Sequence, residues 1–95
     1  QNISNQIPSG YFLGQNYPNP FNSTTTIRFA LLKKDNVTIK LYDLLGKEAG
    51  IILNNVFDAG TYEVNYDASS LMSGAYFYRI TAGTFIDTKK FVLLK

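Results

Sequence analysis

Hydrophobic and polar residues alternate along most of this chain. In one stretch, for example, Ile27 and Phe29 share one parity and Arg28 takes the other. Successive side chains of a β-strand point to opposite faces, so this alternation predicts strands with one buried and one solvated face. The pattern, or a short apolar run, recurs in seven segments: 11–13, 24–31, 37–41, 48–53, 61–66, 75–80 and 85–94.

Turn-forming residues separate these segments at intervals of about 8–12 residues, a spacing that is typical of antiparallel β-sandwiches. No segment has the hydrophobic period of a helix, and residues 67–73 have room for one helical turn at most. The sequence therefore predicts an all-β fold, an immunoglobulin-like (Ig-like) antiparallel β-sandwich of about seven strands. The last segment loses its clean alternation at Lys89 and Lys90, which predicts a β-bulge or an edge position there.

The first ten residues differ in character from the rest. They consist mostly of Asn, Gln, Ser and Ile, with Pro8 and Gly10 as turn formers, and they offer little to bury. We therefore expect residues 1–10 to be a linker to an upstream domain and residues 11–95 to form the sandwich.

The expected core contains no disulfide, because the chain has no cysteine. It depends on packing of the inward-facing apolar residues, which are Ile27, Phe29, Ile39, Leu41, Tyr62, Val64, Tyr78 and Ile80. Tyr76 follows Leu71 and Gly74 at the start of a strand, where Ig-type sandwiches place a tyrosine whose hydroxyl bonds back to the chain a few residues upstream. Tyr76 is therefore a candidate for such a tyrosine corner, and plain core packing is the alternative.

Size and charge narrow the function classes. The chain has 95 residues, of which 45% are hydrophobic and 17% charged, as expected for one globular domain. Nine basic and seven acidic residues give a net charge of +2, too small to indicate a nucleic-acid or membrane-surface partner. No apolar run approaches the roughly 20 residues of a membrane span.

Residue types argue against catalysis. The absence of Cys and His removes thiolate sites, the usual general base and the commonest metal ligand. Most of the seven carboxylates lie in predicted turns, and no nucleophile-elbow or phosphate-loop motif occurs. We expect neither enzymatic activity nor a cofactor or metal. Calcium binding stays open, because oxygen ligands would suffice for it. The acidic residues are scattered along the chain, however, and this does not favour a calcium site. Phe77 is the candidate exposed aromatic for carbohydrate binding, the alternative being that a loop or the parent protein covers it.

The residues also resemble a known family. Four blocks carry the resemblance in order along the chain: QNYPNPFN (15–22) with TTTIRF (24–29), VTIKLYDLLGK (37–47), GTY (60–62) with LMSGAYFY (71–78), and TKKFVLLK (88–95). Together they are similar to type A C-terminal sorting domains of the bacterial type IX secretion system. The matching motif positions are Pro18, Asn19, Pro20, Tyr42, Asp43, Gly46, Gly74 and Tyr76. The chain departs from the family at Ala49–Gly50, which puts the start of that strand in doubt.

The resemblance implies a function. Such domains are Ig-like sandwiches at the C-terminus of large secreted proteins of Bacteroidetes and related phyla. They are recognised by the type IX outer-membrane translocon, and a sortase-like peptidase commonly removes them. The resemblance thus implies an upstream cargo domain, passage through the periplasm and outer membrane, and a secreted or cell-surface location.

The closing block is the candidate recognition segment. It consists of Lys89, Lys90, Phe91, Val92, Leu93, Leu94 and Lys95. If this strand lies at a sheet edge, it could pair with a receptor strand through main-chain hydrogen bonds, with its lysines adding charge complementarity. The alternative is that the lysines only protect the edge from aggregation. Pro18 and Pro20 are expected to stiffen the turn that precedes the strand beginning near residue 24.

Two other function classes stay open. The opening motif is also similar to the Ig-like domain of flagellar hook-capping proteins, which indicates a structural spacer. An accessory module that binds carbohydrate or protein, at the end of a secreted enzyme, is the further alternative.

Overall fold

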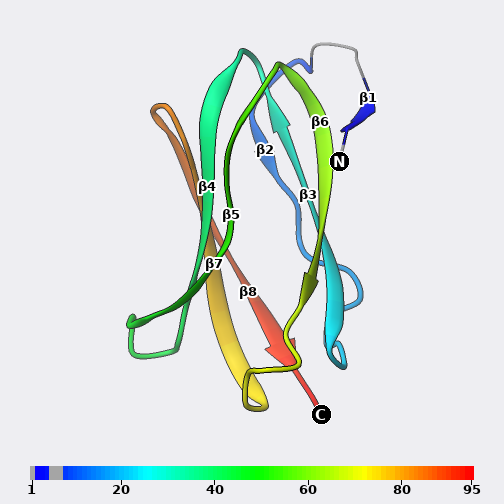
Figure 1. Cartoon of the computed structure of the whole chain (residues 1–95), viewed down its shortest axis with the longest axis vertical. Helices are drawn as coiled ribbons and strands as arrows, with labels where there is room; N and C mark the ends of the chain where they lie inside the picture. Colours follow the sequence, from blue (N-terminus) through cyan, green and yellow to red (C-terminus); the bar gives the residue numbers. More distant parts are fainter. Residues whose placement is uncertain (1, 5–7) are drawn as a thin grey trace.

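Eight strands, and no helix, form in the described residues (2–4 and 8–95) of the computed structural model (Figure 1). The strands are β1 (Asn2–Ser4), β2 (Phe12–Leu13), β3 (Thr24–Leu31), β4 (Asp35–Tyr42), β5 (Glu48–Phe57), β6 (Gly60–Asp67), β7 (Gly74–Ala82) and β8 (Phe85–Leu93).

The strands form two four-stranded antiparallel sheets that pack face to face, with orders β1-β6-β3-β2 and β5-β4-β7-β8 (Figure 1). The predicted Ig-like sandwich is therefore confirmed. All seven expected strands are present, because the period-2 pattern that predicts each of them also decides which face is buried.

The eighth strand, β1, lies in the segment that we expected to be a linker. Asn2–Ser4 pairs with β6 at the edge of the first sheet. Pairing of this kind uses main-chain groups and requires no apolar pattern, so three residues give no alternation from which to predict it.

Strand β5 starts at Glu48 as expected but runs on to Phe57, four residues beyond its expected end at residue 53. Asparagine is unfavourable in strands, and for this reason the expected strand ends before Asn54 and Asn55. The structure pairs Asn54 with Thr38 across the strands, with a side-chain hydrogen bond of 3.3 Å. A register shift lies between the pairs Leu41–Gly50 and Tyr42–Glu48, at the position of the family departure Ala49–Gly50.

The core lies between the sheets. Seven of the eight expected core residues are buried, and Val64 is half-buried. Several residues outside the expected core list are also buried, namely Leu13, Phe21, Leu31, Val37, Phe91 and Leu93. Alternation already placed Leu31 and Val37 on the same faces as listed core residues. Phe91 is central among these buried residues, because its ring lies near those of Phe21, Tyr66, Tyr76 and Tyr78 at centroid distances of 4.9–6.5 Å.

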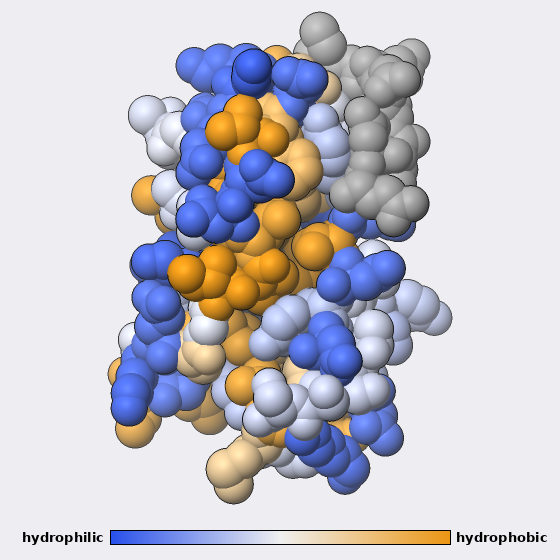
Figure 2. All heavy atoms as spheres, viewed as in Figure 1, coloured by the Kyte–Doolittle hydropathy of each residue, from blue (hydrophilic) through white to orange (hydrophobic). Residues whose placement is uncertain are grey.

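The two edge strands of the second sheet, β5 and β8, differ in how far their outer edges are covered. At the β5 edge no strand of the described chain pairs with the outer side, and residues 49–57 carry no charge. Figure 2 shows apolar side chains gathered over this region, where Ile51 and Val56 are exposed. At the β8 edge, by contrast, the chain itself covers part of the strand.

Candidate functional site

The candidate recognition segment is the end of β8, an edge strand whose register with β7 runs without a shift along its whole length. Of the two alternatives for Lys89 and Lys90, the edge position is therefore confirmed and the bulge does not form. Alternation persists through the lysines: Lys90 is exposed on the outer face, whereas Lys89 has the inward parity and is half-buried. Inward-pointing charge of this kind is a common protection of edge strands.

Residues 14–22, which we name the opening segment, cover the second half of the β8 edge. The Val92 N–H donates to Asn19 Oδ1 (2.9 Å), and the Phe21 N–H donates to the Val92 carbonyl (3.0 Å). The Leu94 N–H donates in turn to the Phe21 carbonyl (2.9 Å). The opening segment therefore satisfies the main-chain groups that a receptor strand would need at this position.

Two further contacts join the opening segment to β8. Gln15 Nε2 donates a hydrogen bond to the Lys90 carbonyl (2.7 Å). The Phe21 ring meets the Phe91 ring edge to face, with centroids 4.9 Å apart, a favourable aromatic geometry. Both rings are buried, so this contact ties the opening segment to the core as well as to the edge.

Asn16 holds the opening segment in place from within. It is 2% exposed, and its Nδ2 donates to Thr25 Oγ1 (2.9 Å) and to the Pro18 carbonyl (3.1 Å). Thr25 Oγ1 donates to the same Pro18 carbonyl (2.9 Å). Pro18 has no N–H to donate, so its carbonyl is the main-chain group through which these two side chains hold the turn.

The Tyr78 hydroxyl links the opening segment to β7. It accepts a hydrogen bond from the Asn16 N–H (2.8 Å) and donates one to the Gly14 carbonyl (2.7 Å). Burial raises the pKa of Tyr78 to about 12, with the hydrogen bond from the Asn16 N–H acting in the opposite direction. The hydroxyl is therefore a neutral structural link at physiological pH.

The chain end is held by the β6–β7 loop. The Lys95 N–H donates to Ser73 Oγ (3.0 Å), and Lys95 Nζ donates to the Ser69 carbonyl (2.6 Å). Leu94 keeps 56% of its surface exposed. Lys90, Leu94 and Lys95 are the exposed side chains of the segment, and of these only Lys95 is held by the β6–β7 loop, whereas Phe91 and Leu93 belong to the core.

The Tyr42-Asp43-Gly46 motif forms the β4–β5 hairpin and lies apart from this cluster. Asp43 Oδ1 accepts the N–H groups of Leu45 and Lys47, each at 2.9 Å. Gly46 has φ of 85°, a conformation in which a Cβ is strained. The Arg79 guanidinium lies over the Tyr42 ring at 5.1 Å. These motif residues determine the hairpin geometry.

The tyrosine corner at Tyr76 is confirmed. Its hydroxyl donates to the Met72 carbonyl at 2.7 Å, four residues upstream. Gly74 begins β7 directly after this loop.

Comparisons with known proteins identify the family. A family model described as the secretion system C-terminal sorting domain matches residues 15–94 of the chain. The chain belongs to this family. The match begins with the opening segment and ends beside Lys95, so it spans both partners of the edge contact.

The sorting domain also has a solved structural neighbour. The crystal structure of dimeric latent PorU from Porphyromonas gingivalis contains a similar fold, with a TM-score of 0.65 and 18% sequence identity. The similarity covers 97% of this chain but 10% of that protein's chain. At this identity the likeness supports the Ig-like fold alone. A comparison with curated proteins gave no match.

Within residues 2–4 and 8–95, no three His, Cys, Asp or Glu residues cluster as metal ligands would. No helix in the same part of the chain is long and apolar enough to cross a membrane. Phe77, the expected exposed aromatic, is half-buried on the outer face of β7.

Sequence reasoning named Asn19 only as a family motif position, and it did not single out Gln15, Asn16, Phe21 or Tyr78 for this cluster. The available signal was the density of Asn and Gln around two prolines, since such residues in a short motif often bind main-chain groups. Their partners are 62 to 75 residues away in the chain, and no local pattern reveals contacts of that range.

Asn19 provides a direct test of the edge contact. We expect Asn19→Ala to speed hydrogen–deuterium exchange at the Val92 amide and to lower the free energy of unfolding by about 0.5–1.5 kcal/mol, because one hydrogen bond is lost. Asn19→Asp, which keeps an acceptor oxygen, is the matched control and should retain protection. Equal exchange in all three proteins would contradict the contact.

Proposed function

We propose that this sorting domain directs an upstream cargo domain, joined through residues 1–10, across the outer membrane by way of the type IX translocon. The cargo would then be secreted or held at the cell surface. The observation that supports the proposal best is the match of the sorting-domain family model to residues 15–94. Within that match the opening segment binds the main chain of β8 and leaves the side chains of Lys90 and Leu94 exposed.

This arrangement favours recognition through side chains. A receptor strand that added to the second half of β8 would first have to displace Asn19 and Phe21. A translocon partner with an apolar socket and carboxylates could instead contact Leu94 and Lys90 without disturbing the sandwich. The alternative, that these lysines protect the edge only, predicts that their charge has no effect on export.

Export of a reporter fused in front of Gln1 tests the function. We expect the reporter outside the cell in a strain with an intact type IX translocon and in the periplasm of a translocon-deficient strain. Extracellular reporter in both strains, or periplasmic reporter in both when a native cargo of the same host is exported, would contradict the sorting role.

Surface substitutions test the recognition segment more sharply than deletion does. Deleting residues 91–95 removes Phe91 and Leu93, which are fully buried, and would unfold the domain. Lys90→Glu with Leu94→Ser should reduce export severalfold while the unfolding midpoint stays within a few degrees of the parent's. Lys34→Glu, an exposed lysine in the β3–β4 turn, is the matched control. Normal export of the double variant would favour the edge-protection alternative.

Removal of the domain by a sortase-like peptidase is a separate part of the proposal. The exported reporter should then be smaller than the fusion by up to 10.7 kDa, the mass of the 95 residues, less whatever part of the linker stays on the cargo. Intact-mass measurement of the extracellular reporter distinguishes cleavage from export of the uncut fusion.

A further inference from the structure

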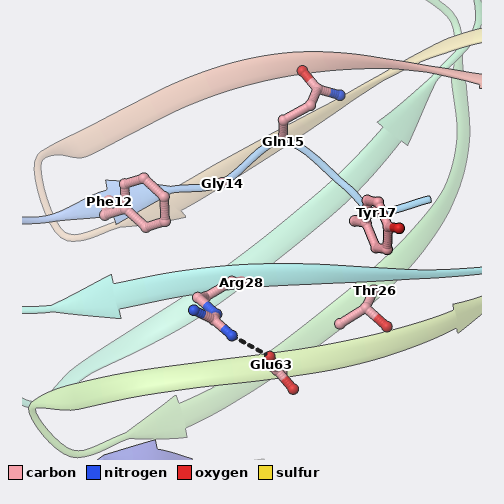
Figure 3. Close-up of a pocket in the computed structure, with 7 residues that line it drawn as sticks. All are labelled: Phe12, Gly14, Gln15, Tyr17, Thr26, Arg28 and Glu63. Atoms are coloured by element: carbon pink, nitrogen blue, oxygen red, sulfur yellow. Dashed lines mark hydrogen bonds and ion pairs between the residues drawn. The ribbon is translucent and has the colours of Figure 1, made fainter. Parts of the chain in front are cut away.

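A shallow hollow of about 510 Å³ lies on the outer face of the first sheet, and Gly14, Gln15 and Tyr17 of the opening segment form part of its lining (Figure 3). Two aromatic side chains, Phe12 and Tyr17, stand at its two ends. Between them, Arg28 from β3 and Glu63 from β6 form its floor, with Thr26 beside Tyr17.

Main-chain pairing to β3 positions both aromatic residues. Phe12 lies opposite Ala30 in the β2–β3 register. Tyr17 exchanges two hydrogen bonds with Thr26, each of 2.9 Å. Thr26 and Ala30 are four positions apart in the sequence, so the two rings project from points about 13 Å apart along the strand.

Gly14 keeps the Phe12 ring close to the sheet. A Cβ at Gly14 would lie 3.1 Å from the Phe12 ring and 3.2 Å from the Arg28 carbonyl oxygen. The Gly14 N–H also donates to that carbonyl at 2.7 Å. The chain can therefore approach β3 closely only because residue 14 lacks a side chain, and the ring packs over the space that is left.

Neither the Phe12 ring nor the Tyr17 ring is packed in the core. Tyr17 is 80% exposed and Phe12 is 48% exposed, whereas the rings of Phe29, Tyr78 and Phe91 are fully buried. Aromatic side chains contribute most when they are covered, so a pair that stands exposed at the rim of one hollow indicates a surface that a ligand covers.

The floor is polar and electrically balanced. Arg28 Nη2 and Glu63 Oε2 form an ion pair of 2.7 Å, and Thr26 Oγ1 donates to Asn65 Oδ1 at 2.8 Å. Because the two charges offset each other, the floor favours an uncharged ligand. Its guanidinium, carboxylate and hydroxyl groups offer both donors and acceptors to such a ligand.

We propose that this hollow binds a neutral oligosaccharide. A sugar ring has an apolar C–H face that packs on an aromatic ring, and its hydroxyls both donate and accept hydrogen bonds, which matches a polar floor between two rings. A proline-rich peptide also docks on exposed aromatic rings, but it presents few donors to a charged floor. This binding activity is independent of the sorting function.

Titration of the 95-residue chain followed by ¹⁵N–¹H NMR tests the proposal. The probes are cellohexaose, mannohexaose and chitohexaose, with a proline decamer as the competing ligand. We expect at least one hexasaccharide to shift the amide signals of residues 12–17 and of Thr26 and Arg28. No shift with any hexasaccharide at millimolar concentration, or a shift of these signals by the proline decamer alone, would overturn the proposal.

Variants separate binding from folding. Tyr17→Ala and Phe12→Ala should each weaken binding about tenfold, as expected for the loss of one stacked ring. Leu45→Ala removes an exposed apolar side chain from the β4–β5 hairpin of the other sheet and is the matched control, with unchanged affinity. The largely exposed Tyr17 allows removal of its ring with little effect on the thermal midpoint. Equal affinity of Tyr17→Ala and the parent chain would exclude this hollow as the binding site.

Because no translocon is present in this experiment, its outcome is independent of whether the domain directs export.

Discussion

Phe91→Ala is expected to lower the free energy of unfolding by about 3–5 kcal/mol, as is typical when a fully buried phenylalanine is truncated. The ring contacts four other aromatic rings, and one of them, Phe21, belongs to the opening segment. Its loss therefore leaves a cavity at the point where the opening segment, β7 and β8 meet. Small domains have total stabilities of about 5–15 kcal/mol, so the variant should be close to unfolding at physiological temperature.

Urea unfolding followed by circular dichroism measures this effect. Ile86→Ala is the matched control, because Ile86 lies on the same strand but is 61% exposed, and its truncation should change stability by no more than about 0.5 kcal/mol. A loss below about 1 kcal/mol for Phe91→Ala would contradict the packing of β8 against the core. The same result matters for export, because a candidate recognition segment that includes a core residue cannot be probed by deletion alone.

Tyr78 should make the stability of the domain fall as the pH rises from about 10 to about 12. An unfolded tyrosine releases its proton near pH 10.0, whereas burial raises the pKa of Tyr78 in the folded domain to about 12. Between these values the unfolded state binds fewer protons than the folded state, so stability decreases with pH. Tyr78 makes its full contribution to the free energy of unfolding below pH 10. About 2–3 kcal/mol of that contribution is lost as the pH rises from 10 to 12.

Tyr78→Phe tests both roles of the hydroxyl. At neutral pH the variant should lose about 2–4 kcal/mol, because the Asn16 N–H and the Gly14 carbonyl lose a buried partner. Its stability should then decline less steeply than that of the parent between pH 10 and 12. Some decline should persist, since burial also raises the pKa values of Tyr62 and Tyr66.

The measurement is a series of urea unfolding curves from pH 7 to pH 12. Tyr17→Phe removes an exposed hydroxyl and serves as the control for stability at neutral pH. Parallel pH profiles for Tyr78→Phe and the parent chain would contradict the proposed alkaline dependence. An unchanged stability at pH 7 would contradict the link between β7 and the opening segment.

The strands and most of the core were predictable because both depend on local parity. Ile27, Ile39 and Ile80 are buried where alternation places them, since a strand with one apolar face has one way to bury it. Tyr76 was predictable for a similar reason, because its hydroxyl reaches a carbonyl only four residues away. The end of β5 was not, since Asn54 and Asn55 favour turns locally and are held in the strand by their neighbours on β4.

The candidate site was predictable only in part. The family blocks located the opening motif and the closing strand, and the lysine pattern indicated an edge. That the two blocks bind each other did not follow, because Asn19 and Val92 are 73 residues apart and meet only when the sheets have assembled. The hollow between Phe12 and Tyr17 was missed as well, since two aromatics in a turn-rich stretch carry no signal of the β3 and β6 side chains beneath them.

The amino-acid sequence alone was enough for the all-β class, the strand positions, the absence of thiol and imidazole chemistry and the resemblance to sorting domains. Each of these depends on residue type or on spacing along the chain. Tertiary structure decided which part of the β8 edge is covered, which lysine side chains stay exposed and which aromatic rings lie outside the core. Those properties arise from contacts between segments that are far apart in the chain. Such contacts stabilise the fold only after both segments have been brought together.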